Sequence, residues 1–320
     1  HGVFVLTGGP GTGKTTTVLR MLLMLQHRSK TPLGVQVAAP TGKAAQRLVQ
    51  ALRDGKRQLL DHATQPLPGL WHDYLDRIPD GEAVTLHRLL GFQPWRNGFS
   101  RDARHPVPAD VVVVDEASMI DLATLRALLD AVRPDALLIL VGDADQLTSV
   151  ATGSVLMDLV TAMQATPDAR DLVRLVHSFR AQPALVSVND AVRHGDPAAL
   201  DVAMLNSAAD AVRRDVHDAA TLGKQLHAWA HRIATALGRA AEHSIPIGDA
   251  FAALAGQQLL CALREGPFGA LAANATLERL LRQAWNVPAD AEWYPGRAVI
   301  ITRNDYAAGL FNGDVGICLA

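Results

Sequence analysis

The stretch Gly8-Gly9-Pro10-Gly11-Thr12-Gly13-Lys14-Thr15 decides the fold of this 320-residue chain. It fits the pattern G-x-x-x-x-G-K-[ST] in full, with a β-rich run before it at Val3–Thr7 and an expected helix after it at Thr15–Gln26. Glycines let the backbone wrap around phosphate groups, and the N-terminus of the following helix adds a favourable dipole. A glycine-rich turn before an ordinary helix is the alternative. Because both flanks match, we predict a phosphate-binding loop.

Two side chains of the loop have the chemistry for a nucleotide. The Lys14 ammonium is expected to reach the β- and γ-phosphates. The Thr15 hydroxyl is expected to ligate Mg²⁺. Other loop residues would contribute mainly backbone N–H groups. The stretch therefore predicts a nucleotide site at the end of the first strand.

Two further apolar runs end in polar residues. Val111–Val114 is followed by Asp115 and Glu116. Asp115 is suited to hold Mg²⁺, and Glu116 to orient or deprotonate a water molecule. A helix-capping role is the alternative for these acids, since Asp-Glu-Ala-Ser precedes an expected helix. The carboxyl ends of parallel strands are where such sheets hold their ligands, so we expect both acids near the phosphate loop.

The third run, Leu137–Val141, leads into Gly142-Asp143-Ala144-Asp145-Gln146. Gln146 could hydrogen-bond the γ-phosphate and report its loss. Asp143 could reach the attacking water or the metal shell. A plain Gly-Asp turn is the alternative. Three strands would then deliver side chains to one rim of the sheet.

The composition excludes several classes of protein. The chain is 49% hydrophobic and 19% charged, which is enough apolar material for a large core and excludes a disordered chain. No apolar run is long enough for a membrane span, and the first residues lack the features of a signal peptide, so we expect a cytoplasmic protein without a membrane partner. Cys261 and Cys318 are too few for a disulfide framework.

The net charge of −2 hides an uneven distribution. Residues 1–60 carry nine Lys or Arg against one Asp, a balance of +8. Residues 110–171 carry eleven Asp or Glu against three Arg, a balance of −8. Uneven decoration of solvated faces is one interpretation. The other is a local surface that faces a polyanion.

The order of the expected elements indicates an α/β protein. Continuous apolar runs separated by helices, including those expected from about Lys43 to Leu52 and over Leu122–Val132, predict a parallel sheet covered on both faces. Beyond about residue 182 alanine-rich helices dominate, with strand-like runs at Leu259–Leu263, Ala298–Thr302 and Val315–Leu319. We place a domain boundary near 176–182. Both ends of the chain fall inside apolar strand-like runs, as expected for a segment of a longer chain.

Taken in order, the motifs resemble those of the superfamily 1 DNA helicases. The resemblance is to the RecD type in particular, the alpha subunits of exodeoxyribonuclease V. It covers nearly the whole chain. In the first half it rests on Gly8–Thr16, Ala39–Ala45, Thr85–Gly91, Asp115–Ser118 and Gly142–Leu147. In the second half it rests on Ser178–Arg180, Leu260–Gly269, Trp293–Arg297, Arg303–Tyr306 and Leu310–Gly316.

The resemblance implies a phosphate-loop NTPase with RecA-like parallel sheets flanked by helices. It implies two motor domains. The first would be residues 1–178, with a small insertion at about 55–81. Residues 179–308 would be part of the second, and 309–320 the start of a small β-barrel insertion. The second motor domain would therefore be incomplete.

The resemblance also assigns roles at the nucleotide site. It implies ATP and Mg²⁺ as cofactors, and Arg180 would reach the γ-phosphate as an arginine finger, although a surface ion pair is the alternative for that residue. The expected catalytic residues are Lys14, Asp115, Glu116, Gln146 and Arg180. The expected metal ligands are Thr15 and Asp115. The expected nucleotide contacts are Gly8, Gly9, Pro10, Gly11, Thr12, Gly13, Lys14, Thr15 and Thr16.

A single-stranded DNA path is implied as well. The positive segment contains Lys43, and proteins that bind single strands need such local charge along the phosphate backbone. Helix capping is the alternative for Thr41, a partly buried packing role for His87, and a structural role for the residues near the C-terminus. The expected DNA contacts are Thr41, Lys43, Thr85, His87, Arg303, Asn304 and Asn312.

The implied activity is ATP hydrolysis coupled to 5′ to 3′ movement on single-stranded DNA, that is, a DNA helicase. The implied partners are the beta and gamma subunits of a helicase–nuclease heterotrimer that acts in double-strand break repair and recombination. A stand-alone RecD-like helicase and a nucleotide-binding switch module without motor activity are the alternatives. The family's N-terminal partner-binding domain and its last motifs have no counterpart here. We therefore expect this chain to bind nucleotide and to hydrolyse ATP slowly.

Overall fold

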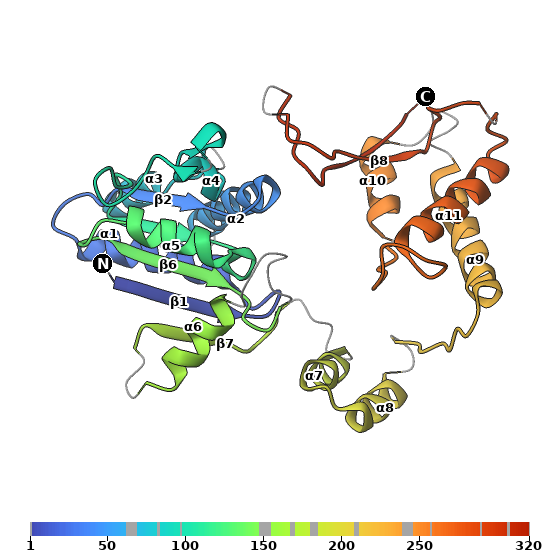
Figure 1. The fold of residues 1–320 in the computed structure, drawn as a ribbon, viewed down its shortest axis with the longest axis horizontal. Coiled ribbons are helices and arrows are strands. Elements are labelled where there is room, and N and C mark those ends of the chain that lie inside the picture. Colours follow the sequence, from blue (N-terminus) through green and yellow to red (C-terminus); the bar gives the residue numbers. More distant parts are fainter. Residues whose placement is uncertain are drawn as a thin grey trace. The chain divides into compact units, whose positions relative to one another are not determined.

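The computed structural model describes most of the chain. The described residues are 2–61, 69–81, 84–96, 98–146, 155–166, 170–179, 185–207, 211–238, 246–256, 258–288, 290–305 and 308–319. They form two compact units, residues 1–211 and 212–320 (Figure 1).

A five-stranded parallel sheet forms the centre of the first unit. Its strand order is β2-β5-β6-β1-β7. The strands are β1 (Gly2–Gly8), β2 (Val35–Ala38), β5 (Val111–Val114), β6 (Leu137–Gly142) and β7 (Leu172–Leu175). All four strand pairs are parallel, so every carboxyl end meets one rim. The predicted α/β fold with a covered parallel sheet is confirmed.

Helices cover both faces of this sheet (Figure 1). On one face the sheet packs against α1 (Lys14–Arg28), α2 (Gly42–Asp61) and α3 (Gly69–Arg77). On the other it packs against α4 (Leu86–Leu89), α5 (Leu122–Ala131) and α6 (Val155–Gln164). Successive valines of β5 alternate between the two clusters, and each is at most 2% exposed. Each such side chain contributes roughly 1.5–3 kcal/mol on burial, which explains the continuous apolar run.

Helix α2 continues beyond the expected end at Leu52. Gly55 lies inside the helix, where a Cβ would stand 2.8 Å from Leu19 Cδ2 of α1. The glycine therefore permits close approach of two helices and does not end one. Lys56 is 8% exposed, donates to the carbonyl of Ile78 and lies 3.0 Å from Asp80 Oδ2. The region predicted as an insertion thus contains the end of α2 together with α3.

A short hairpin and two helices complete the first unit. The hairpin pairs β3 (Phe92–Gln93) with β4 (Gly98–Phe99) and has a 3₁₀ turn at Pro94–Arg96. Helices α7 (Val186–His194) and α8 (Pro197–Asn206) pack against each other. The contacts of both helices group them with residues 1–211, whereas the sequence suggests a boundary near 178. The sequence-based domain bounds stay a prediction.

The described residues of the second unit form three helices and a hairpin. Helix α9 (Ala219–Leu237) packs on α11 (Ala270–Ala284) through Leu226, Ala230, Ala273 and Leu277. Helix α10 is Ile247–Ala255, and β8 (Ala298–Ile300) pairs antiparallel with β9 (Val315–Ile317). The strand expected at Leu259–Leu263 was wrong, since this described segment is irregular. An apolar run becomes a strand only with a hydrogen-bonding neighbour, and β8 and β9 pair with each other.

The Trp293–Arg297 stretch, quoted for the family resemblance, is a packing motif. Tyr294 is 6% exposed and lies under the guanidinium of Arg282, 5.1 Å from the ring centre. Burial raises the pKa of its hydroxyl above the usual value. Gly296 has a φ of 85° and lies against the Trp285 ring. Together these contacts attach the hairpin to α11.

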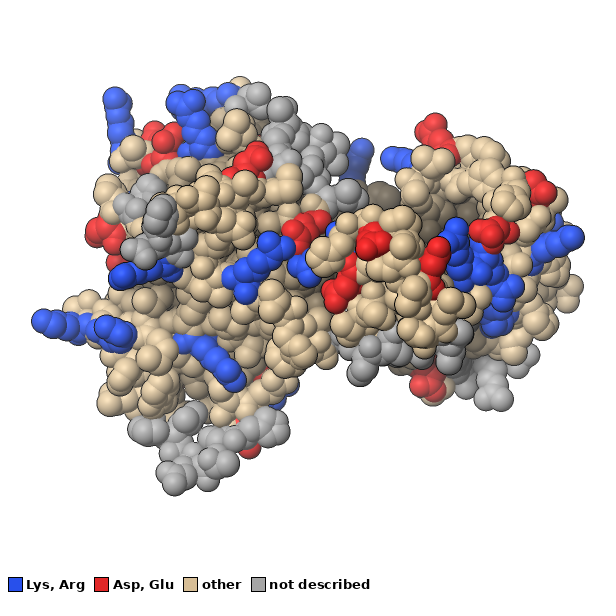
Figure 2. Space-filling model, turned by 90° about the horizontal axis from the view of Figure 1, so that it is seen from below, with Lys and Arg blue, Asp and Glu red and all other residues tan. Residues whose placement is uncertain are grey.

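No helix in the described ranges combines the length and the apolar character needed to cross a membrane. On the face seen in Figure 2, basic and acidic side chains are interspersed. The charge imbalance of the sequence therefore does not separate by sign on this face.

Candidate functional site

The phosphate loop follows β1 and leads directly into α1. Gly11 and Gly13 have φ values of 74° and 84°, the left-handed region that glycine adopts without strain. A Cβ on Gly8 would stand 2.7 Å from the carbonyl oxygen of Leu175, so the loop begins where two strands approach closely. Thr12 Oγ1 donates to the Gly9 carbonyl at 2.8 Å and closes the turn. The backbone thus forms a cradle at a helix N-terminus, as the sequence predicted.

Lys14 lies across the loop that it belongs to. Its Nζ donates to the carbonyls of Gly8 at 2.6 Å and Gly9 at 3.0 Å. The ammonium is the cation that lowers the pKa of Asp115, against the larger effect of burial. Lys14, the first residue of α1, and Asp115, directly after β5, are therefore close enough for their charges to interact.

Asp115 and Glu116 stand at the carboxyl end of β5. Burial raises the pKa of the Asp115 carboxyl to about 6, with the Glu116 charge adding to the rise. The Glu116 N–H donates to Asp115 Oδ1 at 2.9 Å. Glu116 has a φ of 52°, a left-handed conformation uncommon for residues other than glycine. Such strain is typical of functional positions.

The loop after β6 is fixed from inside the sheet. The Ala144 N–H donates to Thr7 Oγ1 of β1 at 3.1 Å, and Thr7 is 2% exposed. Asp143, 5% exposed, accepts from the Asp145 N–H at 3.1 Å. A Cβ on Gly142 would stand 2.7 Å from Leu156 Cδ2 and 3.1 Å from the Ser118 nitrogen. The structure brings Gln146, at the exposed end of this loop, to the same rim as Lys14 and Asp115.

A segment far along the sequence lies on the phosphate loop. Ser178 Oγ donates to the Pro10 carbonyl at 3.0 Å, and the Phe179 N–H donates to the Gly11 carbonyl at 2.9 Å. A Cβ on Gly13 would stand 3.9 Å from the Phe179 ring, which is 76% exposed. The sequence predicts no role for either residue. Arg180, which it did single out, lies outside the described residues.

Candidate DNA contacts of the first unit converge after β2. Ala39 forms a parallel bridge to Thr85, and the Leu86 N–H donates to the Ala39 carbonyl at 2.8 Å. Thr41 Oγ1 accepts from the Ala44 N–H at 3.2 Å, and Thr85 Oγ1 from the Arg88 N–H at 3.3 Å. Both threonines thus cap helices, the alternative that capping chemistry offered for Thr41.

The remaining two candidates lie beside these threonines. Lys43 lies in the first turn of α2. His87 is exposed and packs its ring against Phe92 at 5.3 Å and Phe99 at 5.7 Å. The histidine therefore connects the proposed DNA path to the β3–β4 hairpin. The DNA contacts themselves stay a prediction.

Arg303, Asn304 and Asn312 lie in the loop between β8 and β9. Asn304 Oδ1 accepts from the Asn312 N–H at 2.8 Å, so two of the three candidates hold the loop together. Arg303 is exposed. The two asparagines thus have the structural role that was the alternative to a DNA contact. A DNA contact of these three residues stays a prediction.

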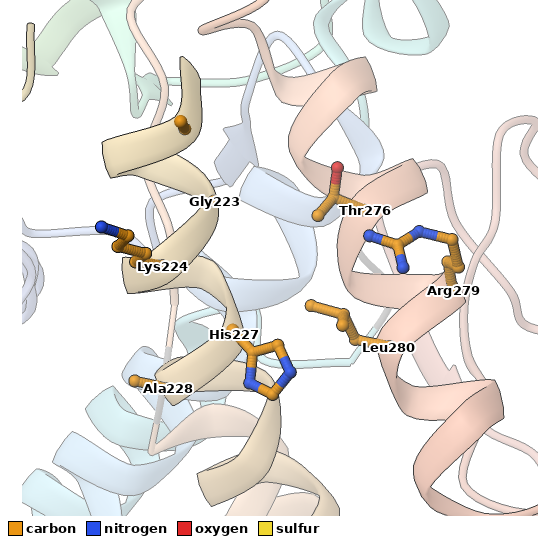
Figure 3. Close-up of a pocket in the computed structure, with 8 residues that line it drawn as sticks. Gly223, Lys224, His227, Ala228, Thr276, Arg279 and Leu280 are labelled. Atoms are coloured by element: carbon orange, nitrogen blue, oxygen red, sulfur yellow. The ribbon is translucent and has the colours of Figure 1, made fainter. Parts of the chain in front are cut away.

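A separate shallow groove runs between α9 and α11 (Figure 3). His227 and Leu280 point toward each other across it, while Arg279 and Thr276 lie on the α11 side. None of the residues predicted from the sequence lines this groove. It is therefore not part of the candidate nucleotide site.

Comparison with known proteins agrees with this geometry. The family described as an AAA domain matches residues 1–152. RecBCD enzyme subunit RecD of Mycobacterium tuberculosis is 40% identical over 330 residues, which is 100% of this chain and 53% of the relative. The subunit of the same name from Mycolicibacterium smegmatis is 38% identical, over 100% of this chain and 55% of the relative. The ATP-dependent RecD2 DNA helicase of Deinococcus radiodurans is 31% identical, over 100% of this chain and 36% of the relative.

A phosphate loop, an acidic strand end and a glutamine loop on one rim of a parallel sheet define a phosphate-loop NTPase domain. The full-length similarity goes further. The resemblance to RecD-type superfamily 1 helicases is confirmed, and the chain is a homologue of that type. It spans about half the length of the RecD subunits that it matches.

Proposed function

We propose that this chain is the motor part of an ATP-dependent DNA helicase that moves 5′ to 3′ on single-stranded DNA. The observation that carries the proposal is the convergence of Lys14, Asp115–Glu116 and the Gln146 loop at one rim. The adjoining 39–43 and 84–87 segments offer a neighbouring surface for DNA.

The residues present fit Mg²⁺ with a nucleotide. Asp115 is a partly buried carboxyl whose pKa burial raises to about 6, against the effect of Lys14. The Thr15 hydroxyl and the Asp115 carboxylate are hard oxygen donors, which Mg²⁺ prefers. No cluster of three His, Cys, Asp or Glu with metal-binding geometry occurs in the described ranges. A shared phosphate–metal site agrees with that, because Mg²⁺ usually keeps waters and phosphate oxygens as ligands.

Each residue then has a step in hydrolysis. Mg²⁺, when bound, neutralises charge on the β- and γ-phosphates. Lys14 leaves the loop carbonyls and binds the same phosphates, while Glu116 orients the attacking water and accepts its proton. Gln146 binds the γ-phosphate and loses that contact after hydrolysis. The proposed role of Arg180 is to stabilise the charge that develops on the transferred phosphoryl group.

The assembly and location belong to the same proposal. The relatives named RecBCD enzyme subunit RecD support a role beside the beta and gamma subunits of exodeoxyribonuclease V, in double-strand break repair in the cytoplasm. The similarity to the Deinococcus radiodurans helicase supports a stand-alone enzyme as the second candidate. Co-purification with the two other subunits separates these candidates.

The test is binding of labelled single-stranded DNA at two salt concentrations, with and without a non-hydrolysable ATP analogue and Mg²⁺. The proposal expects salt-sensitive binding whose affinity changes with the analogue. Nucleotide binding without DNA binding at either salt would contradict it and favour a switch module. The measurement needs no turnover, so slow hydrolysis does not obscure the result.

A further inference from the structure

One carboxylate at the rim of the site is bound by two arginines from different elements. Asp145 Oδ2 accepts from Arg174 Nη2 at 2.6 Å, and from Arg193 Nε at 3.1 Å and Nη2 at 2.8 Å. Arg174 belongs to β7, and Arg193 to the last turn of α7. The three side chains are each about one third exposed. None of them had a role in the sequence analysis.

Asp145 lies next to a residue of the candidate nucleotide site. It directly precedes Gln146, the proposed γ-phosphate sensor. The Gln146 side chain has no hydrogen-bond partner among the described residues, so its direction follows from the backbone of the loop. From inside the sheet that backbone is held by Thr7 and Asp143. On the exposed side, the Asp145 carboxylate connects the same backbone to Arg174 of β7 and Arg193 of α7.

The carboxyl of Asp145 is ionised at neutral pH and therefore carries the charge that both arginines bind. Hydrogen bonding to Arg193, followed by the charges of Arg174 and Arg193, holds the pKa of the Asp145 carboxyl below its usual value. The pKa of the Arg193 guanidinium is raised, mainly by its hydrogen bond to Asp145, and the charges of Asp143 and Asp190 add to this rise. A half-exposed ion pair contributes little to global stability. Its effect is therefore geometric: it fixes where one loop stands against one helix.

Arg193 also links the loop to a specific part of the chain. Helix α7 begins at Val186, a few residues after Arg180, the proposed arginine finger. Two donors of Arg193, Nε and Nη2, bind the same oxygen, Asp145 Oδ2, which restricts the orientation of the guanidinium as well as its distance. The state of the Gln146 loop and the position of α7 are thus joined by a direct contact.

We propose that Asp145, Arg174 and Arg193 are positioning residues that orient Gln146 toward the γ-phosphate and couple that loop to helix α7. The inference rests on the proposed nucleotide chemistry of this site. Its signature is selective: the cluster should affect recognition of the γ-phosphate and leave recognition of the α- and β-phosphates unchanged.

The test compares ADP with a non-hydrolysable ATP analogue, both with Mg²⁺, on the 320-residue chain. We expect Arg193→Ala and Asp145→Asn each to lower the preference for the analogue at least about fivefold, the lower range of a coupling between sites. Affinity for ADP and the unfolding temperature should not change. The double variant should lose no more than Asp145→Asn alone, because that substitution already weakens the contact with Arg193. Arg193→Lys should restore part of the preference, since it keeps the charge without the fork.

Arg170→Ala is the matched control, because this exposed arginine precedes β7 and makes no ion pair within the described ranges. Unchanged preference in both single variants would overturn the inference, as would an equal loss of ADP and analogue affinity. A wild-type chain that binds nucleotide without preferring the analogue would also overturn it. A wild-type chain that binds neither would instead overturn the proposed function.

Discussion

The backbone N–H of Phe179 donates to the carbonyl of Gly11 at 2.9 Å, although the two residues are far apart in the sequence. The segment that leads to Arg180 therefore begins on the phosphate loop itself. Ser178 adds a second bond to the Pro10 carbonyl. These bonds use two carbonyl groups of the loop and none of its N–H groups. Four predictions follow from the geometry of this rim.

Replacing Lys14 tests the nucleotide site directly. Lys14→Ala should weaken binding of Mg²⁺–ATP by about 10- to 100-fold, because a charge-assisted hydrogen bond contributes roughly 1.5–3 kcal/mol. Titration with a fluorescent nucleotide measures the loss. Lys30→Ala, an exposed lysine beyond α1, is the control. Equal nucleotide affinity in the Lys14 variant and wild type would place the phosphates elsewhere.

The partly buried Asp115 carboxyl predicts a pH dependence of stability without nucleotide. Its pKa of about 6 exceeds the ordinary value of 3.8, so the folded protein binds this proton more tightly than the unfolded chain does. Its contribution to the free energy of unfolding is therefore largest below about pH 4 and falls as pH rises to about 6. We expect Asp115→Asn to be more stable than wild type at pH 7, by about 2 kcal/mol.

Urea denaturation of both proteins between pH 4 and pH 7 measures this difference. The advantage of the asparagine variant should shrink toward pH 4, where the wild-type carboxyl is protonated in the folded state and the unfolded chain begins to bind the same proton. A difference that stays constant across this range would show that burial of Asp115 does not govern its ionisation. Mg²⁺ and nucleotide should reduce the advantage, since they favour the charged carboxylate.

Lys43 tests the proposed DNA path. Lys43→Ala should weaken single-stranded DNA binding and reduce the salt slope by about 0.7, the value for one phosphate contact on a single strand. Nucleotide affinity should stay the same. Arg57→Ala, near the other end of α2 and paired with Asp54, is the matched control. If the salt slope of the Lys43 variant equals that of wild type, the DNA does not follow this helix.

Replacing Gly142 tests how tightly the Gln146 loop is packed. A Cβ there would meet Leu156 Cδ2 at 2.7 Å and backbone nitrogens of Ser118 and Ala117 at 3.1 and 3.2 Å. Gly142→Ala should therefore lower the free energy of unfolding by about 1–3 kcal/mol and reduce ATP hydrolysis. Gly69→Ala is the control, because its Cβ would meet nothing within 4 Å. Wild-type stability in the Gly142 variant would mean that the loop moves freely.

The sequence predicted the sheet and its rim well because both depend on local patterns. Continuous apolar runs such as Val111–Val114 can be recognised as buried strands, and the polar residues after them must then meet at the carboxyl ends. The length of α2 could not be predicted in the same way. A glycine such as Gly55 usually indicates the end of a helix. Its actual role, to let α2 approach Leu19 of α1, depends on a contact that the sequence does not show.

Long-range side-chain contacts were beyond the reach of the sequence. Nothing local to Asp145 indicates that Arg174 and Arg193 bind it, since one lies on another strand and the other on a later helix. The strand expected at Leu259–Leu263 failed for a related reason. Whether an apolar run pairs into a sheet depends on a partner strand, which the run itself does not specify.

Thr7 connects the phosphate loop to the neighbouring strands. Its buried hydroxyl accepts the Ala144 N–H, while its backbone stands in register with Gly142 on one side and Arg174 on the other. It is also the residue directly before Gly8. The Thr7 side chain thus connects the end of β1 to the segment after β6, and its backbone pairs β1 with β7 at the same level. A displacement of the phosphate loop would therefore move the Gln146 loop and β7 together with it.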